Sequence, residues 1–317
     1  MSEESPERGA SRMSVEEMIS YAQAHPPLEQ GIMVRLLSPL GVYPTEGFRH
    51  REAAMVLSQD VCAILTAFKK VQVPDDYHSE VEFLSPFDVR LLASVILSRV
   101  PDSGSICLYP TPLAMERPDA GFDLSDVRAL DQLMSEFRTF IQGERQYREL
   151  HSPPLIGGRA YSFNEYASLR YAHQREIFDA IDVSNHLMTR GLGALIRAFM
   201  LFSLSEFTES AGMSLWVAME ASFEIVKGIL RAQGIERPTA QDAGDFVDDV
   251  FDNQFASEGY FPDYYEDRIK TVHPASRYGI FPGAGLAHDD VWELGIDLIH
   301  LYDFLVTGHV PDELKGH

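Results

Sequence analysis

Residues 210–234, SAGMSLWVAMEASFEIVKGILRAQG, have the sequence pattern of one long helix in this chain of 317 residues. Thr208 leads into the segment, and Gly234 ends it as a glycine at the C′ position ends a helix. Apolar residues lie on several sides of this helix, so other helices have to cover it. The segment therefore predicts a helical bundle in the second half of the chain.

Helical patterns continue on both sides of this segment, in residues 164–204, 239–255 and 290–307. The first of them holds one long helix or two, with a break at Asn185 or at residues 191–193. Asp289 or Asp290 starts the last one, and a glycine again ends it. Residues 159–317 are therefore predicted to form a bundle of four or five helices.

The first half of the chain is also predicted to be mostly helical, so the whole protein is expected to be mainly α. Helices are predicted from Ser14, over residues 48–71, from Ser85-Pro86 and over residues 125–150. Residues 28–47 are predicted to be loop with one short strand, and residues 101–122 to be an irregular strand or an ordered loop. The expected organisation is a disordered tail (1–12), a mostly helical domain (13–151), a linker (152–158, SPPLIGG) and the bundle.

Composition limits the possible partners and compartments. The net charge of −22 repels phosphate, so any nucleic acid has to bind through a local basic pocket. No apolar run reaches the roughly 18 residues of a membrane span, and the N-terminus is polar. Cys62 and Cys107 have the context of buried, reduced thiols, and no Cys or His spacing is typical of a metal site. We therefore expect a cytoplasmic protein with no metal, no cofactor and no membrane partner.

Residues 259–279, GYFPDYYEDRIKTVHPASRYG, form the candidate catalytic stretch. Pro262 and Asp263 are typical of a helix start. Arg268 lies in the second half of this helix, and His273 directly precedes a proline, which favours a helix end at the histidine. The pattern places a cation and an imidazole close together at an open helix C-terminus.

Such a pair can cleave a phosphodiester. The imidazole serves as general acid or base near neutral pH, and the guanidinium binds the non-bridging phosphate oxygens. No metal is required when a neighbouring 2′-hydroxyl is the nucleophile. The spacing alone is weak, because Arg145 and His151 nearly reproduce it. The alternative is a salt-bridged Arg268 and a His273 that only ends the helix.

The order SLWVAMEASFEIVKGIL, YYEDRIKTVHPASRYG and VWELGIDLIHLYDFLVTG resembles the HEPN superfamily of helical-bundle domains. Its members carry an R-x(4–6)-H motif and dimerise so that two motifs face one cleft, and active members cut RNA without metal. The resemblance implies phosphate binding by Arg268, acid–base chemistry by His273 and a homodimer. Ile269 stands where the family motif usually has a polar residue, so the resemblance also allows a member that only binds RNA.

Four further residues are candidates for supporting roles. Glu220 can pair with Arg268 or orient His273, and its alternative is an ion pair with Lys227 on the same helix. Cations interleaved with aromatic rings suit single-stranded RNA, a pattern formed here by Lys270, Arg277 and Tyr264. The alternative role for the tyrosine is a core or interface residue.

The predicted function is that of a metal-independent endoribonuclease or RNA-binding protein of a bacterial defence or toxin-type system. The alternative is a non-catalytic helical interaction or regulatory module. Nine carboxylates and no Lys or Arg occur between Asp242 and Asp267, and this acidic face can bind a basic protein partner.

Overall fold

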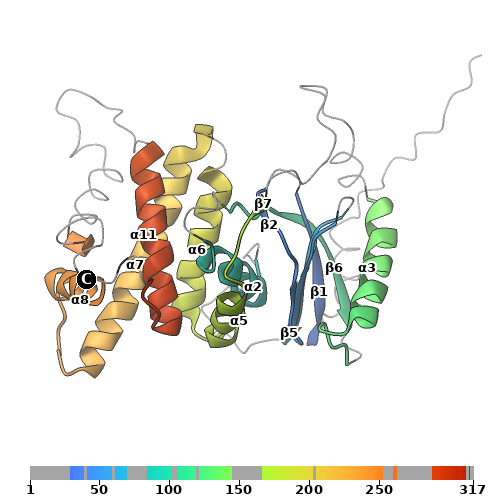
Figure 1. The fold of residues 1–317 in the computed structure, drawn as a ribbon. Helices are drawn as coiled ribbons and strands as arrows, with labels where there is room; N and C mark the ends of the chain where they lie inside the picture. Colours follow the sequence, from blue (N-terminus) through green and yellow to red (C-terminus); the bar gives the residue numbers. More distant parts are fainter. Residues whose placement is uncertain are drawn as a thin grey trace, which may run out of the picture.

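The computed structural model describes residues 29–38, 41–58, 61–69, 84–100, 106–118, 121–144, 166–202, 205–252, 260–262, 288–311 and 314. Figure 1 shows an antiparallel sheet on one side of the molecule and a bundle of helices on the other. The predicted tail, the helix from Ser14 and the linker at 152–158 lie outside the described residues.

The sheet has the strand order β3-β4-β5-β1-β6, and all of its neighbouring strands are antiparallel. Its central strand β1 pairs Val34 with Leu65 of β5 on one side and with Met115 of β6 on the other. The strands are β1 (Gln30–Leu37), β3 (Phe48–Arg49), β4 (Ala53–Val56), β5 (Ala63–Lys69) and β6 (Pro110–Pro118).

Helices cover both faces of this sheet. Helix α3 (Val127–Gln142) lies on the outer face, where its apolar stripe packs on alternate strand residues such as Ile32, Val34 and Leu36. Helix α2 (Pro86–Leu97) lies on the inner face, between the sheet and the bundle, and is buried on almost all sides. Ser85 caps α2 in a reciprocal capping box with Asp88, as the Ser85-Pro86 signal predicts.

The bundle consists of α5 (Tyr171–Ala180), α6 (His186–Phe202), the short helix η2 (Ser205–Phe207), α7 (Thr208–Ala232), α8 (Ala240–Val250) and α11 (His288–Thr307). These helices confirm the prediction of a helical second half, with α7 at the predicted position. The break near Asn185 is also confirmed, since α5 ends and α6 begins there. Residues 191–193 do not form a break, because they lie inside α6.

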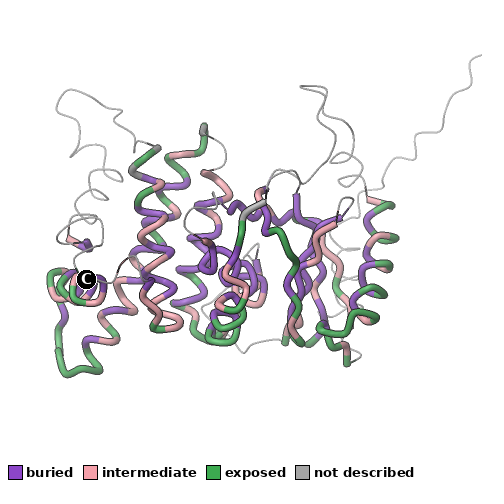
Figure 2. The backbone as a smooth tube through the Cα atoms, viewed as in Figure 1, coloured by how far each residue is buried: buried purple, intermediate pink, exposed green. Residues whose placement is uncertain are grey.

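One buried apolar cluster joins the two halves of the chain. It contains α2 residues, the inner faces of the strands and the cores of α5, α6, α7 and α11. Figure 2 shows this continuous buried region between the sheet and the helices. A short parallel pair, β2 (Tyr43–Pro44) with β7 (Tyr166–Ala167), also connects the halves. None of the described helices combines the length and apolarity needed to span a bilayer.

The helix predicted over residues 48–71 is wrong, because its described residues form β3, β4 and β5. A strand covered on both faces has apolar residues on both faces, so it lacks the alternation of a half-exposed strand. Ala63, Ile64 and Leu65 are all fully buried, two against α3 and one against α2. The same covering explains β1, a central strand where the sequence predicts loop with one short strand.

Candidate functional site

The structure places only one of the predicted site residues. Arg268, His273, Lys270, Arg277 and Tyr264 lie outside the described residues. Glu220 lies in the middle of α7 and is half-buried.

Glu220 lines an apolar pocket of about 170 Å³. Met219 and Phe223 of α7, Ala240 of α8 and Phe261 form the described rest of the lining. Phe261 belongs to the candidate catalytic stretch and precedes Arg268 by seven residues. Its ring packs against Phe223, with ring centroids 5.0 Å apart. The stretch therefore enters the described structure at the pocket that holds Glu220.

The ion pair of Glu220 with Lys227, left open by the sequence, is not formed. The Lys227 ammonium pairs with Glu224 instead, with Nζ 2.6 Å from Oε1. Lys227 also lies over the Phe223 ring, 4.8 Å from its centroid. Glu220 thus keeps its carboxylate at the pocket and not at the lysine.

The acidic face of α8 begins with a residue that stabilises the helix. Hydrogen bonds from the Thr239 backbone N–H and hydroxyl lower the pKa of Asp242. Because Asp242 and Thr239 form a capping box, this stabilisation is present above the ordinary Asp pKa and is lost as the pH falls through the lowered value. Asp245 and Asp249 are exposed on the same helix. The acidic face of α8 is therefore solvated at Asp245 and Asp249 and capping at Asp242, whereas Asp248 is half-buried.

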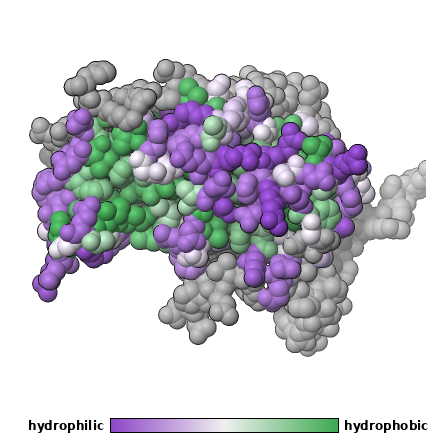
Figure 3. Space-filling model, turned by 60° about the horizontal axis from the view of Figure 1, so that its bottom comes forward, coloured by the Kyte–Doolittle hydropathy of each residue, from purple (hydrophilic) through white to green (hydrophobic). Residues whose placement is uncertain are grey.

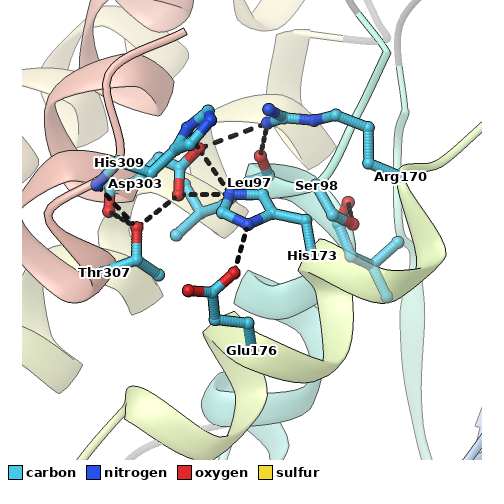
Figure 4. A network of polar contacts seen from close by, with 9 residues as sticks. Leu97, Ser98, Arg170, His173, Glu176, Asp303, Thr307 and His309 are labelled. Atoms are coloured by element: carbon cyan, nitrogen blue, oxygen red, sulfur yellow. Dashed lines mark hydrogen bonds and ion pairs between the residues drawn. The ribbon is translucent and has the colours of Figure 1, made fainter.

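A second cluster of ionisable side chains lies where α5 meets the C-terminal end of α11 (Figure 4). His173 comes from α5, Asp303 from the last turns of α11, and His309 from the residues after α11. One potential ligand atom of each lies within 4.8 Å of the other two. Arg170 and Glu176 complete the cluster.

Asp303 is the centre of this cluster and is 1% exposed. Its two carboxylate oxygens lie 2.8 and 2.9 Å from His173 Nε2. Arg170 Nη2 donates to Oδ2 at 3.2 Å, and the same nitrogen donates to the Leu97 backbone oxygen at 3.2 Å. The buried negative charge is thus paired with a guanidinium and lies within hydrogen-bonding distance of an imidazole.

Both ring nitrogens of His173 face carboxylates. Nε2 lies against Asp303, and Nδ1 lies 3.1 Å from Glu176 Oε2. An ionised carboxylate only accepts hydrogen bonds, so a ring nitrogen that carries a hydrogen donates to the carboxylate it faces. The two carboxylates therefore orient the His173 ring between them.

His309 is held beside His173 by the end of α11. Gly308, at φ +73°, ends the helix in the left-handed conformation, and its N–H donates to the Phe304 oxygen. The His309 N–H donates to Thr307 Oγ1 at 3.1 Å, and this hydroxyl also contacts Asp303. The ring centroids of His309 and His173 are 4.6 Å apart. Backbone geometry thus fixes the position of His309.

No Cys or His spacing in the sequence is typical of a metal site, and the sequence does not single out His173. His173 and Asp303 are separated by 130 positions and meet only through tertiary packing. The local sequence carries one partial signal, the His173 and Glu176 pair at i and i+3 on one helix. Nothing in the sequence pairs that helix with Asp303. No family model, curated protein or solved structure matches the chain.

Proposed function

We propose that the stretch around Arg268 and His273 binds RNA and cleaves it without a metal, in a HEPN-like homodimer of a defence or toxin-type system. The sequence Arg268-x4-His273-Pro274 between α8 and α11 carries this proposal. His273 takes the proton of a 2′-hydroxyl, and Arg268 stabilises the charge on the phosphate. The products are a cyclic phosphate and a free 5′-hydroxyl.

The packing of the bundle supports this proposal. Helix α7 packs against α6, α8 and α11, so the stretch leaves from and returns to helices that flank α7. Phe261 seats the start of the stretch at the Glu220 pocket. A carboxylate at that place can orient an imidazole or pair with a guanidinium. We therefore assign Glu220 the part of a positioning residue for Arg268 or His273, with Lys270, Arg277 and Tyr264 as RNA-contacting residues.

Cleavage of total RNA by the purified chain in EDTA tests the proposal. The natural protein is expected to cut, and His273→Ala is expected to leave the RNA intact. His151→Ala is the matched control, because His151 also follows an arginine at similar spacing. It should cut like the natural protein. Equal cleavage by the natural protein and His273→Ala, or none by either, argues against the enzyme.

The Glu220→Gln variant should cleave more slowly than the natural chain, but faster than His273→Ala. A carboxylate near an imidazole favours its protonated form, so its removal is expected to move the acid limb of the pH–rate profile to lower pH. Glu224→Gln is the control on the same helix, because Glu224 pairs with Lys227 and does not line the pocket. An unchanged profile in Glu220→Gln contradicts a positioning role.

The second candidate function is a non-catalytic interaction module. The exposed carboxylates of α8, Asp245 and Asp249, suit a basic protein partner. Figure 3 shows apolar side chains gathered on the bundle side of the face drawn, whereas polar side chains dominate towards the other side. RNA that stays intact while the protein retains a basic partner favours this function.

A further inference from the structure

We propose that His173, Asp303 and His309 bind one divalent transition-metal ion, which cross-links α5 to the end of α11 (Figure 4). Two imidazole nitrogens and one carboxylate form the donor set of many Zn²⁺ sites. Mg²⁺ and Ca²⁺ prefer oxygen ligands and fit this set poorly. The class of ligand is therefore an ion such as Zn²⁺ or Co²⁺, with the remaining coordination positions filled by water.

The distances in the cluster are close to those of a coordination sphere. Tetrahedral Zn²⁺ with bonds of about 2.1 Å separates its ligand atoms by roughly 3.4 Å. His309 Nδ1 lies 3.5 Å from Asp303 Oδ2, and His173 Nε2 lies 2.8 and 2.9 Å from the two oxygens. All three ligand atoms lie within 4.8 Å of one another. Shifts of roughly an ångström therefore convert the cluster into a three-ligand site.

Two further observations point to a cation. His309 Nδ1 is buried and forms no hydrogen bond with a described residue, and Asp303 Oδ2 lies 3.5 Å away, so a cation between the two atoms would satisfy both. Glu176 accepts from His173 Nδ1 at 3.1 Å. This arrangement is the carboxylate–histidine pair that orients metal-binding imidazoles and increases their basicity.

Arg170 and a proton compete with the ion for the same atoms. The guanidinium lies 3.2 Å from Asp303 Oδ2, and His173 Nε2 lies 2.8 Å from Asp303 Oδ1. A metal binds only an unprotonated Nε2, so the affinity for the metal falls as the pH decreases. Removal of the Arg170 charge should raise the affinity. In a purely structural ion-pair network Arg170 only stabilises the fold, so its removal would not raise the affinity for a metal. The change in metal affinity therefore distinguishes the two cases.

The experiment is a titration of the full chain, stripped with EDTA and dialysed, with Zn²⁺ and Co²⁺. We expect one equivalent of bound metal, a visible Co²⁺ absorption spectrum and a rise in Tm. Excess Mg²⁺ or Ca²⁺ should not displace the ion. Because the chain carries a net charge of −22, weak cation binding elsewhere has to be separated from this site.

Matched variants make that separation. His309→Gln should abolish the Co²⁺ spectrum, because it removes a ligand. Glu176→Gln should weaken binding about 10- to 100-fold. Arg170→Gln should tighten it by roughly tenfold or more. His186→Gln removes a histidine outside the cluster and should change nothing. Circular dichroism in EDTA checks that each variant folds.

Three results overturn the proposal. The first is no stoichiometric Zn²⁺ or Co²⁺ in the natural protein. The second is equal binding by His309→Gln and His186→Gln, which assigns the metal to surface carboxylates. The third is weaker binding by a folded Arg170→Gln. None of these measurements involves RNA. The metal-binding proposal and the proposed RNA cleavage can therefore each be contradicted without affecting the other.

Discussion

The Asp88→Ala variant is expected to lose about 3–5 kcal/mol of its free energy of unfolding. Asp88 is fully buried at the start of α2, where the helix faces the sheet. Its carboxylate lies 3.4 Å from Arg35 Nη2 of β1 and accepts from the Thr66 hydroxyl at 2.8 Å. Truncation removes the carboxylate that pairs with Arg35, a residue that is 8% exposed. Urea unfolding followed by circular dichroism measures the loss.

The chain offers a matched control for this variant. Asp88 also accepts from the Ser85 N–H, as the third residue of a capping box. Asp242 fills the same place in the capping box of α8, but on the surface and without a basic partner among the described residues. Asp242→Ala therefore measures the loss of a helix cap alone. It should lower the free energy of unfolding far less than Asp88→Ala does. Equal losses in the two variants contradict a stabilising role of the buried pair.

A double replacement separates the charge from the packing. Replacing Arg35 by Met and Asp88 by Leu together removes both charges and leaves apolar side chains of similar size. This variant is expected to be more stable than Asp88→Ala, because it no longer buries the Arg35 charge. If the double variant is the less stable of the two, the remaining Arg35 charge is not what destabilises Asp88→Ala.

The Gly191→Ala variant is expected to lose roughly 3 kcal/mol of stability through overpacking. A Cβ at this position of α6 would overlap Tyr302 Oη and lie 2.8 Å from Tyr302 Cζ and 2.9 Å from Ala221 Cβ. Tyr302 is fully buried on α11 and donates to the Ala218 oxygen at 2.6 Å, and burial raises the pKa of its hydroxyl. The ring therefore cannot move without leaving its hydrogen bond. Thermal unfolding measures the change.

Two companion variants identify the cause. Gly228→Ala, at an exposed position of α7 with open space around its Cα, should gain about 0.5–1 kcal/mol from helix propensity. Tyr302→Phe removes the overlapping oxygen, so adding it to Gly191→Ala should cost less than the sum of the two single variants. Strict additivity would show that the tyrosine hydroxyl is not the obstacle.

Local sequence signals predict the helices that start at a cap. Ser85-Pro86 and Thr239 begin α2 and α8, and Gly234 and Gly308 follow the ends of α7 and α11. These signals act through hydrogen bonds to nearby backbone groups, so neighbouring residues are sufficient to specify them. The helical bundle was predictable for this reason.

The sheet and the His173–Asp303–His309 cluster depend on distant residues. Helices on both faces make the strands apolar throughout, which hides their period from the sequence. The cluster forms only because α5 packs against α11, and no spacing in the sequence encodes that contact. The Glu220 pocket was predictable in part, since the sequence indicates the helix α7 and Glu220 as a candidate residue, but not that Phe261 closes the pocket.

The central claim, that His273 and Arg268 cleave RNA through a 2′-hydroxyl, is tested most directly on a single RNA oligonucleotide cut by the protein in EDTA. The prediction is a product with a 2′,3′-cyclic phosphate, no cut when the nucleotide at that position is 2′-deoxy, and a rate about 100- to 10,000-fold lower for His273→Ala. A cut that persists in the deoxy-substituted RNA, or that proceeds at the natural rate in His273→Ala, would contradict the claim.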